Sequence, residues 1–354
     1  KKYYLYEINE RYGNAILPKI ELINIKQSNQ PILSNVTIDA INNVIKKNEQ
    51  VLILHNRRGY SAIKVCNEVD EILKCSNCDI ILTFHANSNS LICHHCNHQY
   101  SFDSQISKKS NQDIKYLGYG TEQLEFILNE NFPNYSVLRM DADSAKSMNK
   151  QNQILDNFIN GNYNILLGTQ MISKGLDIKN VTLVVILNVD LGMSIPDFKS
   201  HEKMFQLINQ VIGRSGRSNK KGRAIIQTTQ PENLMIQMAT NYELKKFYNL
   251  QLDNRKSFSF PPFCRLLRII VHSKNEQKCE IHAHRIFDLL NSNFSNLIIG
   301  PLPCPIEKIF SYFRYHIIIK IPPKKLKFVI NKMHSIIKNK SFVNSKNIKI
   351  LIDM

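Results

Sequence analysis

Apolar and polar residues alternate along the chain in blocks that predict strands and helices in turn. Short, nearly continuous apolar runs occupy residues 51–55, 114–118, 136–140, 163–168, 182–188 and 222–228. Such runs are typical of strands that are buried on both faces of a parallel sheet. Helical spacing of apolar residues is found instead at residues 37–48, 121–131 and 149–159. The alternation predicts an α/β lobe whose parallel strands are joined by right-handed crossovers.

Two parts of the chain depart from this pattern. After residue 60 the alternation breaks until about residue 112, which indicates an insertion between the first and second strands of the lobe. Residues 235–255 are helical by pattern, and Phe260-Pro-Pro-Phe263 ends that stretch. The remainder is predicted to fold as βαββαβ, a split βαβ order of the ferredoxin-like kind. Its expected strands and helices lie at residues 266–272, 276–290, 297–300, 315–321, 324–337 and 348–352.

Composition narrows the class of protein. With 354 residues, 43% hydrophobic and 21% charged, the chain should form two or more globular domains, and it has no apolar run that could span a bilayer. The formal net charge of +17 favours a polyanionic partner such as nucleic acid. An excess of Lys, Asn and Ile, typical of AT-biased coding, explains the charge equally well. The chain opens with Lys-Lys-Tyr and no targeting segment, from which we expect a fragment of a cytoplasmic protein.

Four of the eight cysteines form two tight pairs inside the insertion. Cys75-Ser-Asn-Cys78 and Cys93-His-His-Cys96 are separated by fourteen residues. Each pair can supply two thiolates at adjacent corners of a tetrahedron, so the set predicts a closed, structural Zn²⁺ site in a reducing compartment. His94, His95 and His98 are alternative ligands, but four cysteines are the simpler set. A segment this short and polar needs the metal for its folding energy.

A second motif follows the strand at residues 182–188. It reads Gln210-Val-Ile-Gly213-Arg214-Ser-Gly216-Arg217 and is predicted to end a helix. The two arginines are three residues apart and share one face if the helix continues that far. A guanidinium group is suited to stabilising charge on a transferring phosphoryl group.

Together these stretches resemble the primosomal replication-restart family of superfamily 2 helicases. The matching stretches are Gly168-Thr-Gln-Met171, Ser173-Lys-Gly175, Asp197-Phe198, the arginine motif at 210–217, Asn56-Arg-Arg-Gly-Tyr60, Gly120-Thr-Glu-Gln123, Pro261-Pro-Phe263 and Gly300-Pro-Leu-Pro-Cys-Pro305. The resemblance covers nearly all of the chain. It implies a RecA-like second helicase lobe with an inserted zinc-binding module, followed by an α+β ferredoxin-like carboxyl-terminal domain. The implied boundaries are 1–34 for the tail of an upstream lobe or a linker, 35–62 and 112–232 for the lobe, 63–111 for the insertion and 233–354 for the last domain.

The resemblance also implies roles for single residues. Arg214 and Arg217 would face the γ-phosphate of ATP as catalytic groups, with Gln210 setting their helix against the nucleotide. Gly175, Asp177 and Gly213 are assigned to the nucleotide, and Gly175 and Asp177 also couple it to DNA. The implied DNA contacts are Arg57, Arg58, Thr169 and Gln170. From the residues alone, Arg57 and Arg58 are either phosphate contacts or solvated loop charges.

The insertion differs from the family pattern of eight cysteines and two zinc ions. The two inner pairs are present, whereas the outer positions read Cys66-Asn-Glu-Val69 and Ser107-Lys-Lys-Ser110. Three of the four outer ligands are therefore missing. We expect one zinc ion, a lost second site and a leftover thiol at Cys66.

The chain contains no Gly-x4-Gly-Lys-Ser/Thr loop and no Asp-Glu-x-His segment. These motifs cradle nucleotide phosphates and handle Mg²⁺. ATP and Mg²⁺ are therefore expected to bind only together with an upstream lobe, and this chain alone should not hydrolyse ATP.

The first hypothesis is the carboxyl-terminal part of an ATP-dependent 3′–5′ DNA helicase that recognises stalled forks and restarts replication through primosome assembly. The alternative is a non-catalytic DNA-binding or primosome-scaffolding remnant. A third reading, another superfamily 2 translocase, fits the cysteine pairs poorly. The implied partners are forked or single-stranded DNA, primosome proteins and single-stranded-DNA-binding protein, with no membrane. A monomer is expected, since nothing in the sequence suggests a coiled coil.

Overall fold

The computed structural model describes residues 4, 6, 17–27, 32–55, 61–66, 71–78, 80–85, 88–93, 95–102, 113–117, 120–145, 147–173, 178–193, 197–216, 220–338 and 348–353. The chain forms two compact units. One comprises Lys1–Ser61, Phe84–Ser88 and Tyr116–Phe247, and the other Ala62–Thr83, Asn89–Lys115 and Tyr248–Met354. Within the described part of the chain, none of the helices combines the length and the apolar character needed to cross a membrane.

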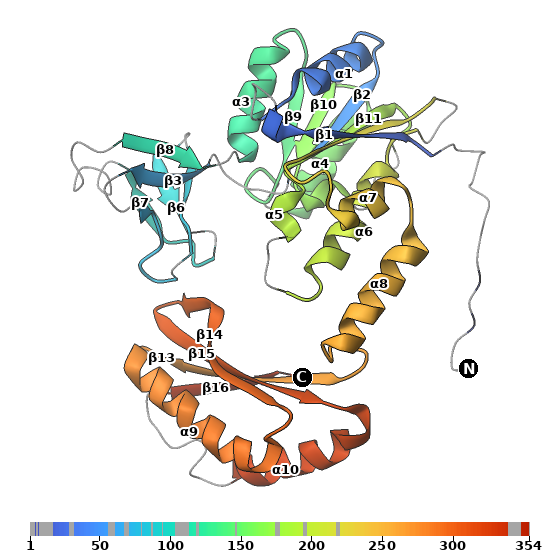
Figure 1. Cartoon of the computed structure of the whole chain (residues 1–354). Helices are drawn as coiled ribbons and strands as arrows, with labels where there is room; N and C mark the ends of the chain where they lie inside the picture. The colour runs from blue at the N-terminus through green and yellow to red at the C-terminus, as the bar shows by residue number, and fades with distance from the viewer. Residues whose placement is uncertain are drawn as a thin grey trace. The chain divides into compact units, whose positions relative to one another are not determined.

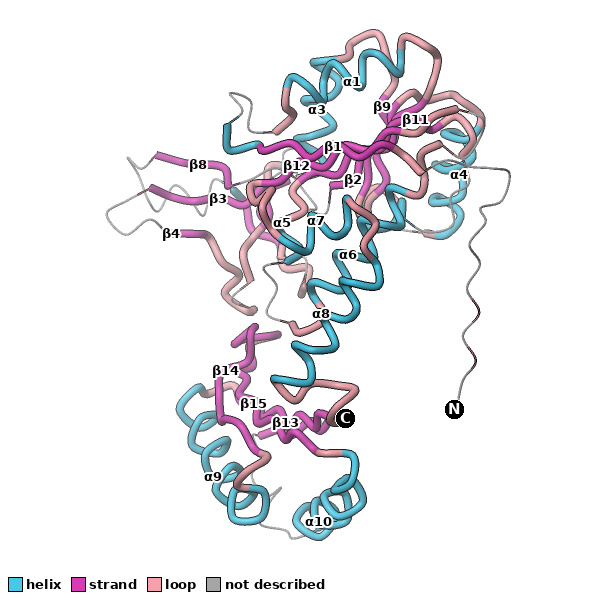
Figure 2. The backbone as a smooth tube through the Cα atoms, turned by 45° about the vertical axis from the view of Figure 1, so that its right-hand side comes forward, coloured by secondary structure: helices cyan, strands magenta, loops and turns pink. Residues whose placement is uncertain are grey.

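The first unit is built on a six-stranded parallel sheet (Figures 1 and 2). Its strands, in spatial order, are β1 (Lys19–Asn24), β12 (Arg223–Thr228), β11 (Val181–Leu187), β2 (Gln50–His55), β10 (Ile165–Gly168) and β9 (Val137–Met140). Every residue of β2, β10 and β11 is buried, which is why these strands are continuous apolar runs. The predicted parallel α/β lobe is confirmed.

Helices cover both faces of this sheet (Figure 1). On one face lie α1 (Asn35–Ile45) and α3 (Thr121–Asn131) with Val51 and Ile53 of β2. On the other face, α4 (Met148–Ile159), α6 (Ser200–Ile212) and α7 (Leu234–Thr240) pack with Leu52 and Leu54. Successive residues of a strand thus pack against the helices on opposite faces of the sheet, as the two-residue period of a strand requires. The N-cap of α1 is Ser34, whose hydroxyl accepts from the Thr37 amide at 3.2 Å.

Two strands pair differently from the sequence-based prediction. β1 is an edge strand of the lobe sheet, parallel to β12, although residues 1–34 were assigned to a tail or linker. An ion pair between Glu21 and Arg223, with Oε2 and Nη2 2.6 Å apart, also joins the two strands. β8 (Asp113–Leu117) pairs with β3 (Ser61–Cys66) of the insertion and not with the lobe sheet. Polar and apolar residues alternate in β8, a pattern more typical of a half-exposed antiparallel strand than of one buried on both faces.

The helical pattern at residues 235–255 is also interrupted. The structure has two helices there, α7 and α8 (Leu244–Ser257), separated by three residues. Tyr242 in the break has a φ of 57°, which no helix accommodates. Beyond the break, the Phe247 ring stacks on Phe205 of α6, with centroids 3.8 Å apart. The break redirects the chain, so α7 buries Met235, Ile236, Met238 and Ala239 while α8 buries Phe247 at its first turn.

A buried charge network joins α3 to the end of β9. Arg139 is paired with Glu122, Glu125 and Asp141 at nitrogen–oxygen distances of 3.4, 3.0 and 3.2 Å. Asp141 is fully buried and accepts from the Thr121 hydroxyl at 2.6 Å. Burial raises the pKa of Asp141, but its hydrogen bonds and Arg139 outweigh that effect, so the pKa is lowered. Burial also raises the pKa of Glu122, but the hydrogen bonds and charges of His85 and Arg139 together outweigh it, so this pKa is lowered as well.

Because of this network, the free energy of unfolding of the first unit should fall as the pH is lowered. Because the folded pKa values of Asp141 and Glu122 are depressed, their contribution is complete above the ordinary carboxyl pKa and is lost as the pH falls through the folded values. Burial raises the pKa of Glu125, which acts in the opposite direction. We expect Asp141→Asn to cost about 3–5 kcal/mol at pH 7, because a buried ion pair is broken. The variant should also show a flatter pH dependence below about pH 4.

Urea unfolding at pH 7 and pH 3.5 checks this expectation. Asp197→Asn is the matched control, since Asp197 pairs with Lys203 at 2.7 Å and the lysine side chain is 65% exposed. An exposed pair of this kind contributes about 0–1 kcal/mol. Equal losses of stability in both variants would contradict the account of the network.

The inserted module is a small sheet with strands in the order β4 (Glu71–Ile72), β3, β5 (Thr83–His85), β6 (Ser90–Ile92) and β7 (Gln99–Ser101), with β8 beside β3. The described antiparallel pairs include β3 with β4 and β6 with β7. These strands are two to six residues long. Strands this short supply few ladder hydrogen bonds, so the module depends on its cysteine cluster for a fixed shape.

The carboxyl-terminal domain has the predicted βαββαβ order (Figure 1). Its elements are β13 (Arg265–Ser273), α9 (Glu276–Phe294), β14 (Ile298–Ile309), β15 (Tyr312–Ile321), α10 (Leu326–Lys338) and β16 (Ile348–Asp353). The strands lie in the order β14-β15-β13-β16, and all neighbours are antiparallel. Both helices pack on one face around Ile269 and Ile319.

Candidate metal centre and arginine motif

The four paired cysteines come together in the inserted module. The sulfur atoms of Cys75, Cys78, Cys93 and Cys96 all lie within 4.8 Å of one another, and the Cys75 and Cys96 sulfurs are 3.7 Å apart. Three of these residues are buried and Cys96 is half-buried. A tetrahedral ion with metal–sulfur bonds of about 2.3 Å requires sulfurs roughly 3.8 Å apart. The donor set therefore fits a closed Zn²⁺ site.

Tight turns shape the two knuckles. In the first, the Cys78 amide donates to the Cys75 carbonyl at 3.2 Å and the Cys75 amide to the Ile80 carbonyl at 2.8 Å. In the second, the Asn97 amide donates to the Cys93 carbonyl at 2.8 Å. Asn97 has a φ of 57°, in the left-handed region that asparagine tolerates better than most residues. These turns point both sulfurs of each pair to the same side.

The environment of three of the four thiols opposes their ionisation. Burial raises the pKa of Cys78, Cys93 and Cys96. For Cys75, burial acts in the same direction but is outweighed by hydrogen bonds, of which the one from the Tyr100 hydroxyl is the largest, and the pKa is lowered. A divalent ion would stabilise all four thiolates together.

Tyr100 is a partner of the first knuckle that sequence reasoning missed. Its hydroxyl lies 3.3 Å from the Cys75 sulfur and accepts from the Ser76 amide at 3.0 Å. Groups that orient metal ligands in this way raise metal affinity. An aromatic four residues after Cys96 was the available signal, but aromatic residues are equally common in a small core.

The arginine motif lies just beyond the end of α6. The helix stops at Ile212 and Gly213 caps it, so the continued helix that would place Arg214 and Arg217 on one face is not formed. Gln210 is exposed in the last turn of α6, and Arg214 is half-buried. The Arg214 Nη2 donates to the carbonyl of Ser173 at 2.6 Å. This contact joins the arginine motif to the segment that follows β10.

Gly216 of the motif and Gly222 beyond it are required by a close backbone crossing. Gly216 has a φ of +71°, and a Cβ there would lie 2.6 Å from the Gly222 nitrogen. A Cβ on Gly222 would in turn lie 2.8 Å from the Gly216 nitrogen. The Gly216 amide also donates to the Val181 carbonyl at the start of β11. The crossing therefore fixes the position of the turn that carries Arg214 relative to the sheet.

The two residues after β10 differ in accessibility. Thr169 is only 5% exposed, whereas Gln170 is exposed at the start of a 3₁₀ turn, η5 (Gln170–Ser173). A direct contact with DNA is thus open to Gln170 but not to Thr169 in this conformation. Gly168, the last residue of β10, has no room for a side chain, because a Cβ there would lie 2.6 Å from the Met140 carbonyl oxygen.

Several expected site residues lie outside the described part of the chain. They are Arg57, Arg58, Gly175, Asp177 and Arg217, together with the outer positions 107–110. Their roles remain predictions from the sequence.

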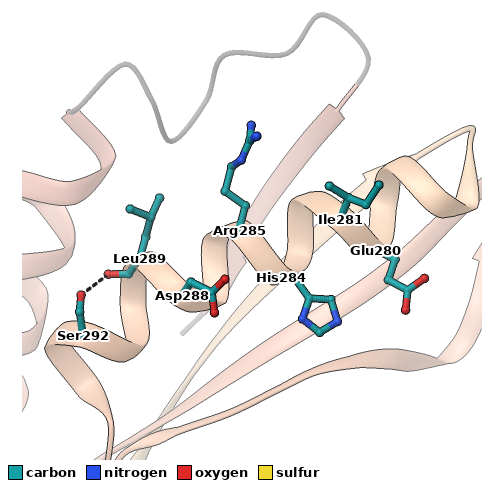
Figure 3. A pocket seen from close by; sticks show the side chains of 7 residues that line it. All are labelled: Glu280, Ile281, His284, Arg285, Asp288, Leu289 and Ser292. Atoms are coloured by element: carbon teal, nitrogen blue, oxygen red, sulfur yellow. Dashed lines mark hydrogen bonds between the residues drawn. The ribbon is translucent and has the colours of Figure 1, made fainter.

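A surface hollow of about 680 Å³ runs along α9, far in sequence from both motifs. Its lining residues all belong to that helix and are shown in Figure 3: Glu280, Ile281, His284, Arg285, Asp288, Leu289 and Ser292. A single helix face with mixed charges provides no convergent set of catalytic groups, so we assign no function to it.

Comparison with known proteins gives three family matches. The model described as "PriA DNA helicase Cys-rich region (CRR) domain" matches residues 75–100, and the "Helicase conserved C-terminal domain" model matches residues 90–219. The "Primosomal protein N C-terminal domain" model matches residues 256–354. The chain is 33% identical over 359 residues to the replication restart protein PriA of Bacillus subtilis, covering 99% of this chain and 44% of that protein.

A second relative is the PriA of Chlamydia pneumoniae, 38% identical over 328 residues, with 90% of this chain and 44% of that protein covered. The chain thus spans less than half the length of these curated relatives. Among solved structures, RecG bound to a three-way DNA junction matches with a TM-score of 0.37 and 12% identity, covering 65% of this chain and 21% of that one.

Proposed function

The chain belongs to the PriA family of replication restart proteins, whose carboxyl-terminal portion it matches, and on this premise we propose that it is part of an ATP-dependent 3′–5′ DNA helicase. The whole protein would recognise stalled forks and restart replication by primosome assembly. The expected fold class, a RecA-like helicase lobe with a cysteine-rich zinc-binding insertion and an α+β carboxyl-terminal domain, is confirmed.

One observation carries this proposal. The guanidinium of Arg214 is bound to the Ser173 carbonyl, so the arginine motif and the segment after β10 form one connected unit. In the proposed mechanism Arg214 and Arg217 stabilise negative charge on the γ-phosphate, while Gln170 and residues 174–177 respond to DNA. A contact between the two segments supports coupling of hydrolysis to movement along DNA.

ATP and Mg²⁺ are proposed to bind only when a further lobe supplies the phosphate-binding loop. This chain has no such loop, and its relatives are more than twice as long. Gly175, Asp177 and Gly213 would complete the nucleotide site from this side. The zinc ion would have a structural role, since four thiolates leave no open coordination position.

The proposed partners are forked or single-stranded DNA, primosome proteins and single-stranded-DNA-binding protein, in the cytoplasm. The net charge of +17 supports a polyanionic partner. Arg57 and Arg58 are proposed as phosphate contacts.

A second candidate is a non-catalytic DNA-binding or scaffolding role. It is favoured by the loss of three of the four outer zinc ligands. The two candidates differ in whether ATP hydrolysis drives the protein along DNA.

Strand separation distinguishes them. We expect this chain, joined to the ATP-binding lobe of a relative, to unwind a forked duplex from a 3′ single-stranded tail and not from a 5′ tail. A gel assay with labelled forks of each polarity measures this. Binding of both forks without strand separation would support the scaffold, and unwinding from the 5′ tail would refute the proposed polarity.

A further inference from the structure

The tip of the β14–β15 hairpin lies against the cysteine knuckles, within the same compact unit. The Ser311 amide donates to the Asn77 carbonyl at 2.7 Å, and the Ser311 hydroxyl lies 3.2 Å from the Asn77 Oδ1. Asn77 is one of the two residues between the cysteines of the first knuckle, and it directly precedes Cys78. The hairpin tip is therefore bound to the backbone that presents Cys78.

A further contact reaches the sulfur itself. The Phe310 amide lies 3.5 Å from the Cys78 sulfur, within range of an N–H···S hydrogen bond. The Phe310 ring lies 5.3 Å from the imidazole of His95, which belongs to the second knuckle. Two consecutive hairpin residues thus contact both halves of the cysteine cluster.

The hairpin loop itself is conformationally unfavourable. Ile309 pairs with Tyr312, leaving a two-residue loop in which Phe310 and Ser311 have φ values of 48° and 65°. Such loops favour Asn-Gly, because positive φ is costly for residues with larger side chains. Phe310 is also 58% exposed, so burial of its ring does not offset that cost. The contacts with the knuckles offset this conformational cost.

We propose that the tip of the β14–β15 hairpin is an outer part of the zinc site, and that zinc binding and docking of this hairpin stabilise each other. Amide donors to a metal-bound thiolate reduce its excess charge, and removal of such outer partners typically lowers metal affinity by about 10–100-fold. By linkage, zinc must strengthen hairpin docking by the same factor. Loss of zinc would then release the carboxyl-terminal domain from the inserted module. The inference rests on the proposed zinc site.

Hydrogen exchange of the whole 354-residue chain tests the coupling. Amides at residues 310–311 are expected to exchange at least about tenfold faster after zinc is removed with a chelator. The central amides of β13 and β15, which lie in the same domain, should keep their protection. Equal exchange at the tip with and without zinc would overturn the inference, and so would a loss of protection throughout the domain.

Two variants at Ser311 test whether loss of the hairpin contact weakens zinc binding. Proline cannot adopt the φ of 65° and has no amide hydrogen, so Ser311→Pro removes the bond to Asn77. Ser311→Gly keeps the amide and the φ and loses only the hydroxyl. Competition with a chromogenic chelator should show zinc binding at least about tenfold weaker in the proline variant and within about threefold of wild type in the glycine variant.

Equal zinc affinity in Ser311→Pro and wild type would contradict the coupling. Absence of zinc from the wild-type chain would instead refute the zinc site, so the two failures are distinguishable. Circular dichroism of the proline variant shows whether the domain is folded, and the exchange experiment on wild type needs no variant.

Discussion

Replacing Cys93 by serine is expected to abolish zinc binding and to unfold the inserted module, while the lobe sheet stays folded. The Cys93 sulfur is fully buried and is one of four sulfurs within 4.8 Å of one another. A structural zinc ion contributes about 10–16 kcal/mol of apparent folding free energy. Besides its cysteines, the part of the module whose side chains the structure describes buries few large side chains, among them Leu73, Leu82 and Leu91. At about 1.5–3 kcal/mol each, they do not offset the entropy of ordering the segment.

Metal analysis and limited proteolysis measure this effect. Wild type should contain one zinc ion per chain and resist cleavage between residues 71 and 102, and Cys93→Ser should do neither. Cys66→Ser is the matched control, because Cys66 is predicted to be a leftover thiol and its loss should leave the zinc content at one. Two zinc ions in wild type, or a metal-free but protease-resistant Cys93→Ser, would contradict the assignment.

Replacing Arg214 by alanine is expected to lower ATP hydrolysis by about 10³–10⁵-fold when the chain is joined to an ATP-binding lobe. A guanidinium at the γ-phosphate acts mainly on charge that develops in the transition state, so DNA affinity should stay within about threefold of wild type. The variant also loses the bond to the Ser173 carbonyl, which positions the side chain. Steady-state hydrolysis with saturating single-stranded DNA measures the effect.

Arg223→Ala is the control for the arginine experiment. Arg223 lies in the same lobe and is paired with Glu21, with both side chains partly exposed. Its loss should cost at most about 1 kcal/mol of stability and leave hydrolysis nearly unchanged. Wild-type hydrolysis by Arg214→Ala, or equal losses in both variants, would refute the catalytic assignment.

Much of the fold follows from local patterns. Continuous apolar runs identify β2, β10 and β11 because these strands are buried on both faces, and helical spacing identifies α1 and α4. The cysteine spacing predicted the metal cluster because each pair closes its own tight turn. Such features depend on residues that are neighbours in sequence.

The remaining features depend on contacts between distant residues. The edge position of β1 requires its pairing with β12, and the place of β8 requires its pairing with β3. The contact of Phe310 with Cys78 spans 232 residues and has no local signal. The end of α6 at Ile212 lies within the predicted stretch 210–217, but the turn that follows depends on the crossing of Gly216 and Gly222, which no helical pattern records.

DNA-stimulated ATP hydrolysis tests the central claim most directly. The rate is measured for this chain alone, for the ATP-binding lobe of a PriA relative alone, and for the two joined in one polypeptide. The account predicts hydrolysis above background only in the joined protein, and only with DNA present. Absence of hydrolysis in the joined protein, with DNA binding retained, would contradict the helicase assignment and favour the scaffold.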